Sequence, residues 1–566
     1  MTKHWAYAPE PLSEEIKSLS EAININPFLA KVLWQRGIDT FDKAKEFFRP
    51  SLNKLHDPFL LTDMSKAVER LHRAIHQQEK ILIYGDYDVD GTTSVALVYS
   101  YLKSFYAHCD FYIPDRYKEG YGVSEAGIIW AEENGFSLII ALDLGIKAGT
   151  MVTLANRKSI DFIICDHHLP DETIPQAVAV LDPKRKDCDY PFKELSGCGL
   201  GFKLIHAFAM KHRNEQEVFQ YLDLVAVSIA SDIVPVNGEN RILAHHGLIK
   251  LNENPRPGLK ALKDIAGIKG TMDISSVVFT IGPRINAAGR VAHARAAVDL
   301  LIASSSEEAL QLAEGVNDKN DLRREFDLSI TEDALAMIEA DGKTRNARST
   351  VLFKETWHKG VIGIVASRCI EKFYRPTVIL TQSNGVITGS ARSVHGFDLY
   401  NAIEACGDLL LKYGGHKHAA GITLLPENLT AFKEKFESVV SSTITEAQRI
   451  PVIDIDCLVN FDSLTWKFNN VLKQMAPFGP ENQRPIFEAR NVFVRNSLSS
   501  FKERHVRFLA GQEGNESIFQ VVGFDQINHY KRLAAGDKFN MAFTLEENTF
   551  NGETSLQMKI RDIKYE

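Results

Sequence analysis

The chain has 566 residues, which is enough for roughly three to four domains of ordinary size. Its composition, with 45% hydrophobic and 24% charged residues, is typical of a folded globular protein and excludes a disordered or collagen-like chain. The formal net charge of −8 excludes a protein that attracts polyanions through its overall charge, so any phosphate-binding site must be local.

The cysteines and the N-terminal sequence indicate the compartment. The 7 cysteines are scattered and form no CxxC pair, which argues against a zinc knuckle or a redox centre and favours a reducing environment. The N-terminal sequence lacks the apolar segment of a signal peptide, and no run of about 18 apolar residues occurs. We therefore expect a cytoplasmic protein without a membrane-spanning segment.

Short apolar runs alternate with helical segments between residues 80 and 166. This alternation predicts parallel strands joined by helices. The expected strands are 80–86, 109–114, 137–143 and 161–166, and the expected helices are 93–105, 124–135 and 148–158. In such a sheet the ligand site lies at the carboxyl ends of the strands, and the acidic residues of this segment lie at those ends.

The rest of the chain contains a helical part, a second α/β part and a β-rich part. Residues 221–234 are expected to form a buried helix, and residues 306–340 form either one helix between two lobes or two surface helices. A second α/β pattern covers 349–448, and short strands after about residue 451 are spaced as in a small barrel, with a type I′ hairpin at Asn551-Gly552. The expected domains are 1–55, 56–305, 306–345, 346–448 and 449–566.

The sequence GDYDVDGTTS at 85–94 places Asp86, Asp88 and Asp90 at the end of a predicted strand. Carboxylates gathered there repel one another unless a cation neutralises them, so the motif predicts a metal site. An EF-hand loop is excluded because Leu97 occupies the position that requires a bidentate Glu, and because the loop follows a strand. A structural acidic turn is the remaining alternative.

Two further strand ends carry similar side chains. Asp143 ends one strand, and Asp166, His167 and His168 end another. A single Asp after a strand is usually a turn or cap residue, but neighbouring ends of parallel strands meet at one crevice. Asp223 lies in an apolar helix, where an unpaired buried carboxylate would need a cation; the alternative is an Asp near solvent at the start of the helix.

This set of donors indicates a reaction. Several carboxylates with one or two imidazoles suit Mn²⁺ or Mg²⁺ better than structural zinc, and five or six ligands leave room for two ions. Two metal ions are the usual clamp for in-line displacement at phosphorus, so the residues predict phosphoester hydrolysis. The chain contains no GxxxxGK[ST] motif, which disfavours an ATP-driven motor.

An ordered series of motifs resembles the DHH phosphoesterase superfamily and, within it, the RecJ single-stranded-DNA exonucleases. The motifs are GDYDVDG (85–91), EGYGVS (119–124), the DHH triplet (166–168), GPRINAAGR (282–290), GIVASR (363–368), GSARS (389–393), GGHKHAAG (414–421) and PFGPENQRPIF (477–487). The resemblance implies that the metal ligands or their immediate supports are Asp86, Asp88, Asp90, Asp143, His167 and Asp223. It also implies that Asp143 bridges two ions, that Asp166 orients an imidazole, and that His168 faces the scissile phosphate.

The resemblance further implies contacts with nucleic acid. Ser390 and Arg392 would form a pocket for a 5′-phosphate, helped by Arg116, and a guanidinium with a hydroxyl suits a terminal phosphate. Arg284 and Asn286 look like nucleotide contacts, although a single Arg in a loop is more often solvated.

Two other segments are candidate nucleic-acid surfaces. Gly414 and Gly415 would let the backbone approach a phosphate, with His416 as a donor; an ordinary helix cap or turn is the alternative. Aromatic and basic residues interleave at 501–508, either as a stacking surface or as part of the core of the barrel.

The predicted fold is therefore α/β: a parallel-sheet DHH domain and a DHH-associated α/β domain joined by a long helix, with a C-terminal β-barrel of the OB-fold type. The predicted function is a Mn²⁺- or Mg²⁺-dependent exonuclease that degrades single-stranded DNA 5′ to 3′ to 5′-mononucleotides in DNA repair and recombination. Single-stranded DNA is the expected partner, a helicase and a single-strand-binding protein are further candidates, and the oligomeric state is open.

Two other functions remain as alternatives. A DHH phosphodiesterase acting on short oligoribonucleotides or cyclic dinucleotides would share the first two domains, but small substrates need no barrel that guides a strand. An inactive DHH replication scaffold would not need the intact set of carboxylates at the strand ends.

Overall fold

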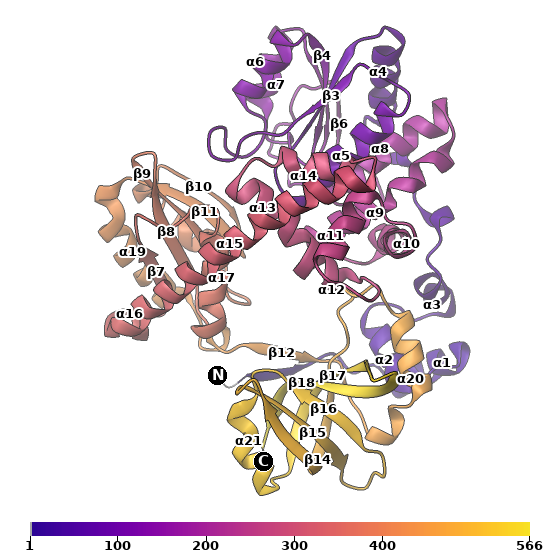
Figure 1. Cartoon of the computed structure of the whole chain (residues 1–566), viewed down its shortest axis with the longest axis vertical. Coiled ribbons are helices and arrows are strands. Elements are labelled where there is room, and N and C mark those ends of the chain that lie inside the picture. Colours follow the sequence, from indigo (N-terminus) through magenta and orange to yellow (C-terminus); the bar gives the residue numbers. More distant parts are fainter. Residues whose placement is uncertain (1–2, 566) are drawn as a thin grey trace. The chain divides into compact units, whose positions relative to one another are not determined.

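The computed structural model describes residues 3–565, which divide into two compact units (Figure 1). The parallel-sheet unit comprises Asp42–Leu322 and Met475–Arg484. The barrel unit comprises the residues up to Phe41, Arg323–Gln474 and the residues from Pro485 onward.

The parallel-sheet unit is built on the sheet that the sequence predicts. Its strands run parallel in the order β3-β2-β4-β5-β6. Their bounds are β2 Lys80–Gly85, β3 Cys109–Tyr112, β4 Phe136–Leu142, β5 Asp161–Cys165 and β6 Ala179–Leu181. Because the chain places β3 on one side of β2 and β4 on the other, the sheet has a topological switch point at the carboxyl ends of β2 and β4. Ligands bind at such points in open α/β sheets.

Alternation along the strands gives the sheet two apolar faces, and helices lie on both sides of the sheet (Figure 1). Ile81 and Ile83 belong to a core cluster that includes residues of α4, α5 and α8. Leu82 and Tyr84 belong to a second cluster, on the opposite face, with residues of α6 and α7. The bounds are α4 Met64–His76, α5 Val89–Lys103, α6 Glu125–Glu133, α7 Gly149–Arg157 and α8 Gly197–His212.

Further helices complete this unit, and the predicted buried helix is one of them. Helix α9 is buried from Leu222 to Ala230 and ends one residue before Asp232. The bounds are α3 Phe41–Phe48, α9 Leu222–Ser231, α10 Gly238–Glu253, α11 Pro257–Ile265, α12 Ile274–Ser276, the π-helical turn η4 Val277–Ile281, α13 Gly282–Val291 and α14 Arg295–Ile302.

The stretch 306–340 is one continuous helix, α15 Ser306–Ala340, rather than two surface helices. The second α/β sheet follows, with strand order β10-β11-β9-β8-β7. Helices α15 and α17 share a core cluster with one face of this sheet, and α18 and α19 share a cluster with the other. The bounds are β7 Thr350–Phe353, β8 Thr377–Ser383, β9 Val386–Arg392, β10 Lys412–His416, β11 Ala419–Leu424, α16 Gly342–Asn346, α17 Ile362–Lys372, α18 Leu399–Glu404 and α19 Leu429–Thr443.

The C-terminal strands close into the predicted barrel. The order β14-β15-β16-β18-β17 returns to β14 through the β14–β17 pairing, which is the connectivity of an OB-fold. Asn551 and Gly552 join β17 to β18 with φ values of 50° and 83°, as a type I′ hairpin requires. The bounds are β13 Cys457–Leu458, β14 Phe487–Phe501, β15 His505–Gln512, β16 Phe519–Gly523, β17 Phe539–Phe550, β18 Glu553–Lys564, α20 Trp466–Gln474 and α21 Tyr530–Ala535.

Two short segments bring together residues that are distant in sequence. The N-terminal strand β1 His4–Tyr7 pairs with β12 Val452–Ile455, and α1 Ser13–Ile23 and α2 Pro27–Gln35 follow it. Residues 475–484 belong to the parallel-sheet unit, where Arg241 donates hydrogen bonds to the carbonyls of Met475 and Ala476. The domain boundaries given above remain predictions, but these contacts show that the barrel unit includes N-terminal residues.

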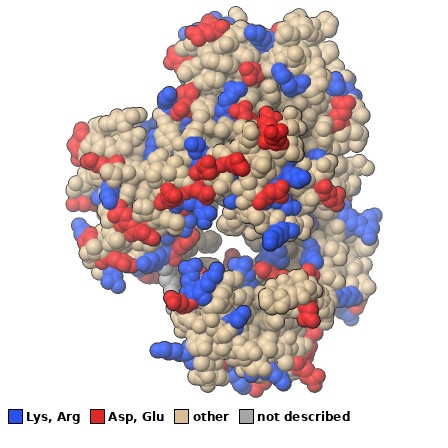
Figure 2. All heavy atoms as spheres, in the orientation of Figure 1, with Lys and Arg blue, Asp and Glu red and all other residues tan. Residues whose placement is uncertain are grey.

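The distribution of charge is mixed. Figure 2 shows basic and acidic side chains interspersed over the face that it draws, with acidic ones prominent along helix α15. Within residues 3–565, no helix is both long and apolar enough to span a bilayer, and all the cysteines are buried and free.

Candidate metal centre

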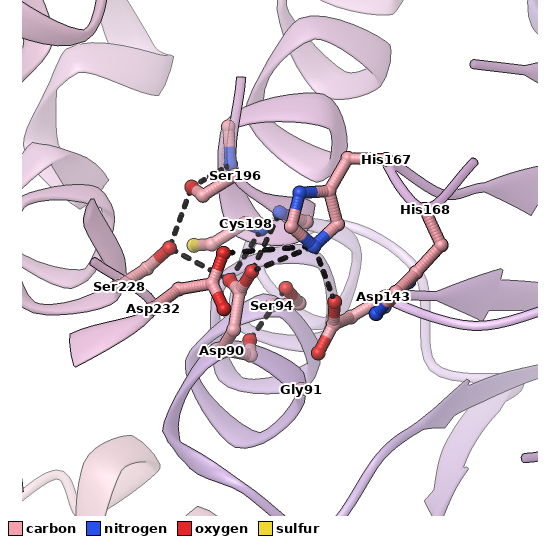
Figure 3. A network of polar contacts seen from close by, with 12 residues as sticks. Asp90, Gly91, Ser94, Asp143, His167, His168, Ser196, Cys198, Ser228 and Asp232 are labelled. Atoms are coloured by element: carbon pink, nitrogen blue, oxygen red, sulfur yellow. Dashed lines mark hydrogen bonds and ion pairs between the residues drawn. The ribbon is translucent and has the colours of Figure 1, made fainter. Parts of the chain in front are cut away.

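The acidic strand ends meet at the switch point of the parallel sheet. Asp86 follows β2, Asp143 follows β4, and the DHH triplet follows β5. Asp86 and Asp143 are 1% and 3% exposed, so these carboxylates lie in a nearly dry environment. Figure 3 shows Asp90, Asp143 and His167 pointing toward one another.

The motif at 85–94 folds locally around the start of helix α5. Asp88 is the N-cap, and its Oδ1 accepts a hydrogen bond from the backbone N–H of Gly91 at 3.0 Å. A Cβ on Gly91 would lie 2.4 Å from the carbonyl oxygen of Asp86, so only glycine permits this close approach. The glycine therefore allows the carboxylates before and after it to share one site.

Asp90 is held by the N-terminus of helix α8. Its carboxylate accepts hydrogen bonds from the N–H groups of Gly197 at 2.7 Å and Cys198 at 2.8 Å, and from Ser228 Oγ at 2.7 Å (Figure 3). Unpaired N–H groups and the helix dipole favour an anion there. Asp90 Oδ2 lies 3.7 Å from His167 Nε2.

Asp143 occupies a position of unusual backbone conformation. Its φ is 61°, and its Oδ1 lies 3.1 Å from His167 Nε2. A Cβ on Gly197 would come within 2.6 Å of the Cβ of Asp143, so the same helix terminus that binds Asp90 also leaves space for Asp143. A left-handed backbone at a non-glycine residue is uncommon and is found often at functional sites.

Asp232, which the sequence analysis missed, lies in the same cluster. It follows helix α9, and its Oδ2 lies 3.6 Å from His167 Nε2. A carboxylate at the C-terminal end of a helix is disfavoured by the helix dipole, so an Asp directly after an apolar helix is a signal for a nearby cation. That signal was present in the sequence at 221–234.

The structure does not bring Asp223, the sixth predicted metal ligand or support, into this cluster. Asp223 is fully buried, but its Oδ1 and Oδ2 accept hydrogen bonds from Arg256 Nη2 at 2.8 Å and Nε at 2.9 Å. The inference that this carboxylate needs a cation was sound, and the guanidinium of Arg256 supplies it. Asp223 also lies outside the metal-binding groups found within residues 3–565.

Ligand atoms in the cluster lie close enough to share metal ions. In the described part of the chain, three groups have ligand atoms within 4.8 Å of one another: Asp86 with Asp88 and Asp143, Asp90 with His167 and Asp232, and Asp143 with His167 and His168. Asp86 Oδ1 and His167 Nδ1 are buried without a hydrogen-bond partner among the described residues. An oxygen-rich set with imidazole and unsatisfied buried polar atoms fits Mn²⁺ or Mg²⁺.

The two histidines differ in charge. Burial lowers the pKa of His167, so its ring is neutral and can ligate a metal. Burial is the largest influence on His168 and opposes its charge, but the hydrogen bond between its Nδ1 and Asp166 at 2.7 Å and the negative charges of Asp166, Asp232 and Asp90 together raise the pKa of His168 to about 9. The carboxylate of Asp166 accepts hydrogen bonds from the N–H groups of Ile146, His167 and His168, which fix its position beside the His168 ring.

Metal binding is expected to raise the Tm more at about pH 8 than at about pH 5.5. Burial and then repulsion among carboxylates raise the pKa values of Asp86, Asp143 and Asp232. A carboxyl group with a higher pKa in the folded state binds protons more tightly when folded. Stability of the metal-free protein therefore falls as pH rises above the unfolded-state value of about 4.

Calorimetry with a chelator and with Mn²⁺ at both pH values would measure this difference. Free metal at about 100 times its Kd stabilises by about 2.7 kcal/mol, which corresponds to a rise in Tm of roughly 4 °C at the higher pH for a unit of this size. An equal rise at both pH values would show that these carboxylates do not bind the metal.

The predicted nucleotide contacts of this unit lie in a turn between β3 and α6 and on helix α13. The Arg116 guanidinium lies over the ring of Tyr87, 4.9 Å from its centre. In the sequence, Tyr87 stands between Asp86 and Asp88. Arg284 and Asn286 lie on helix α13, where Arg284 donates to Thr280 O at 2.8 Å and to Asn317 Oδ1 at 3.1 Å. Arg284 is thus held by the protein itself.

The other predicted contacts lie in the second sheet, and all of them except Gly415 share one of its faces. Arg392 Nη1 donates to Ser390 Oγ at 3.0 Å, and a Cβ on Gly363 of helix α17 would come within 2.9 Å of both side chains. Gly414, Gly415 and His416 form part of strand β10 rather than a helix cap or turn.

Strand pairing aligns these residues in two rows. Ser390 pairs with Gly421, which pairs with Gly414; Arg392 pairs with Ala419, which pairs with His416. A Cβ on Gly414 or Gly421 would meet no atom within 4 Å, so the middle of this face is open backbone.

Three family models match the chain. They are the DHH family N-terminal domain at residues 80–229, the DHHA1 domain at 346–442 and the RecJ OB domain at 455–562. The match to the DHH model contains Asp86, Asp90, Asp143 and the DHH triplet.

Curated relatives and solved structures agree with these models. The chain is 36% identical to the single-stranded-DNA-specific exonuclease RecJ of Bacillus subtilis over 98% of this chain and 70% of the relative. It is 30% identical to that of Escherichia coli K12 over 95% and 96%.

The crystal structure of RecJ from Thermus thermophilus in complex with Mn²⁺ matches with a TM-score of 0.85 at 27% identity, covering 100% of this chain and 80% of that one. A manganese-bound structure of exonuclease RecJ matches with a TM-score of 0.60 at 31% identity, covering 69% and 97%. Together with the carboxylates gathered at the switch point, these similarities show that the chain belongs to the RecJ family of single-stranded-DNA-specific exonucleases and is a metal-dependent phosphodiester hydrolase.

Proposed function

We propose that this chain degrades single-stranded DNA from its 5′ end and releases 5′-mononucleotides. The proposal depends mainly on the position of Asp143. Asp143 belongs to two possible metal-binding groups, one made only of carboxylates and one that contains His167. Similarity to RecJ exonucleases supports the substrate, and the RecJ OB domain supports a path for a strand. The polarity and the product come from the family resemblance.

In this proposal Asp86, Asp88 and Asp143 hold one ion, and Asp90, His167 and Asp232 hold the other. Bound ions would neutralise the phosphate and generate the hydroxide nucleophile from water. Asp143 contacts His167 and shares a group with Asp86 and Asp88, which supports a bridging role. Asp232 replaces Asp223 in the ligand set.

His168 is suited to contact the scissile phosphate. Its Nδ1 is bonded to Asp166 at 2.7 Å, which fixes the ring and leaves Nε2 to face the substrate. When Nε2 carries a proton, a ring fixed in this way can donate to a phosphate oxygen. Asp166 itself acts only by orienting this ring.

Ser390 and Arg392 are proposed to bind the terminal 5′-phosphate beside the N-terminus of helix α17. The proximity of both side chains to Gly363 supports this role, because the first turn of a helix favours anions. The open backbone at Gly414 leaves room for a strand, and His416, at the end of the row that contains Arg392, offers a donor. Arg116, Arg284, Asn286 and Gly415 remain proposed nucleotide contacts.

Arg392→Ala is expected to raise the KM for 5′-phosphorylated oligonucleotides by about tenfold to a hundredfold with little change in kcat. The guanidinium contact with a dianion is made on binding and is kept in the transition state. Steady-state kinetics on phosphorylated and hydroxyl-ended oligonucleotides would measure the effect, with Lys435→Ala on helix α19, which covers the other face of the sheet, as the control. The same loss on both substrates would contradict a pocket for the terminal phosphate.

The function is tested by digesting end-labelled oligonucleotides with Mn²⁺. Single-stranded DNA labelled at its 5′ end should release a labelled 5′-mononucleotide first, while duplex DNA and single-stranded RNA should be cut more slowly. Release from the 3′ end would overturn the polarity, and preferential cleavage of dinucleotides or cyclic dinucleotides would favour a small-molecule phosphodiesterase.

A helicase and a single-strand-binding protein remain predicted partners, and a cytoplasmic location and a role in repair and recombination remain predictions from the sequence. Co-purification from cells, with and without nuclease treatment, would test the partners.

A further inference from the structure

The EGYGVS segment at 119–124 is a loop that is fixed at both ends. At its start, the Glu119 carboxylate accepts hydrogen bonds from Tyr112 Oη at 3.0 Å and from the N–H of Asp115 at 2.7 Å. At its end, Ser124 caps helix α6 and donates its N–H to Tyr84 Oη at 3.1 Å. Ser124 Oγ also donates to Glu119, so the two ends are joined.

The tip between these ends consists of Gly120, Tyr121 and Gly122, and the N–H of Gly120 donates to Asp115 O at 3.3 Å. Gly120 and Gly122 have φ values of 87° and 91°, and a Cβ at either position would meet no atom within 4 Å. Glycine is therefore required there by the backbone conformation and not by lack of space. Tyr121, between them, is 59% exposed. A loop with fixed ends and a tip between two glycines can move its central side chain at little cost.

The hydroxyl of Tyr121 points at the metal centre although most of its ring is exposed. Its Oη lies 3.2 Å from Nε2 of His168, and its ring packs edge-on against that of Tyr87 at 6.3 Å. Burial of the hydroxyl and the charges of Asp143 and Asp86 raise the pKa of Tyr121, so the hydroxyl stays protonated.

The Tyr121 hydroxyl is in hydrogen-bonding contact with Nε2 of His168, which is the atom that would donate to a phosphate oxygen of the substrate. Nδ1 of His168 is bonded to Asp166, which leaves Nε2 as its other donor. A substrate phosphate that binds Nε2 must therefore displace the hydroxyl. The displaced ring would remain above the centre, because its loop is fixed at both ends.

We propose that residues 119–124 form a lid and that the Tyr121 ring, once displaced from His168, stacks on the base of the nucleotide being removed. The proposal rests on the proposed function, because its ligand is a nucleotide of single-stranded DNA. Every base has a π face, so one aromatic ring can hold any of the four nucleotides without reading sequence. Tyr121 is thus a positioning residue for the nucleotide.

A double-mutant cycle between Tyr121 and the base tests the stacking contact. The kcat/KM of wild type and Tyr121→Leu is measured on an oligonucleotide with an ordinary 5′-terminal nucleotide and on one with an abasic terminal nucleotide. If the ring stacks on the base, the kcat/KM of wild type should be about tenfold to a hundredfold lower on the abasic oligonucleotide than on the ordinary one. The kcat/KM of Tyr121→Leu should be about the same on both oligonucleotides. Tyr121→Phe keeps the ring and should keep the difference between the two oligonucleotides.

Equal losses for Tyr121→Leu on both oligonucleotides would overturn the stacking proposal while leaving the nuclease function intact. A wild-type protein that fails to degrade the ordinary oligonucleotide would instead overturn the proposed function. The two failures are therefore distinguishable.

The motion of the lid has its own test. Gly120→Ala and Gly122→Ala are compared with Gly135→Ala, because Gly135 in the same unit also has a positive φ of 74° and open space around its Cβ. All three variants should lower the Tm by similar amounts. Only the lid variants should reduce kcat/KM, by about threefold to tenfold, because they restrict the hinge. An equal effect of Gly135→Ala on activity would contradict a moving lid.

Discussion

Asp143→Asn is expected to lower kcat by at least about a thousandfold while the protein stays folded. Asp143 contacts His167 and belongs to two of the ligand groups, so its loss should weaken the binding of both ions. Several kcal/mol of transition-state stabilisation depend on the ions, and about 4 kcal/mol corresponds to a thousandfold in rate. Asparagine tolerates the positive φ of 61° at this position, so the backbone should not change.

The stability of this variant should move in the opposite direction from its activity. Burial and repulsion by Asp90 and Asp88 raise the pKa of Asp143, which means that the metal-free protein tolerates this charge poorly. The Tm of metal-free Asp143→Asn should therefore equal or exceed that of metal-free wild type near neutral pH, since one repulsive charge is removed.

Metal stoichiometry, kcat and Tm together test the assignment. Asp171→Asn is a matched control, because Asp171 is exposed and pairs only with Lys147 at 3.5 Å in the described contacts. The control should keep full activity and both ions. An Asp143→Asn variant that still binds two ions and turns over at the normal rate would refute the bridging role.

The sequence predicted the part of the centre that depends on local pattern. Asp86, Asp143 and Asp166 each follow an apolar run, and the carboxyl ends of parallel strands meet at one edge of a sheet. Topology alone therefore brought these residues together. The long helix α15 and the hairpin at Asn551-Gly552 were also readable, because each depends on residues close in sequence.

The errors concern contacts between residues far apart in sequence. The charge on Asp223 is neutralised by Arg256, which lies 33 positions later, and no local pattern links the two. Likewise, the N-terminal strand β1 pairs with β12, and Trp5 Nε1 donates to Asp562 near the other end of the chain. Periodicity describes which face of an element is buried, but it does not identify the charged partner on that face.

Asp232 and Asp223 provide the second large test, because their asparagine variants should show opposite behaviour. Asp232→Asn is expected to lower kcat by at least about a hundredfold and to weaken metal binding, because its carboxylate lies 3.6 Å from His167 Nε2 within a ligand group. Its stability without metal should not fall, because burial and repulsion by Asp90 and Asp88 raise the pKa of Asp232 and make its charge unfavourable.

Asp223→Asn is expected instead to destabilise the protein by about 3–5 kcal/mol, or roughly 5–8 °C in Tm, because it leaves the charge of Arg256 without its bidentate partner. Below its melting temperature this variant should bind metal and turn over almost normally. Both variants change one carboxylate oxygen to an amide nitrogen, so each is the other's control for shape. Calorimetry, metal titration and measurement of kcat would separate the two variants. A loss of metal binding by a stable Asp223→Asn protein would restore Asp223 to the ligand set. Normal turnover by Asp232→Asn would remove Asp232 from that set.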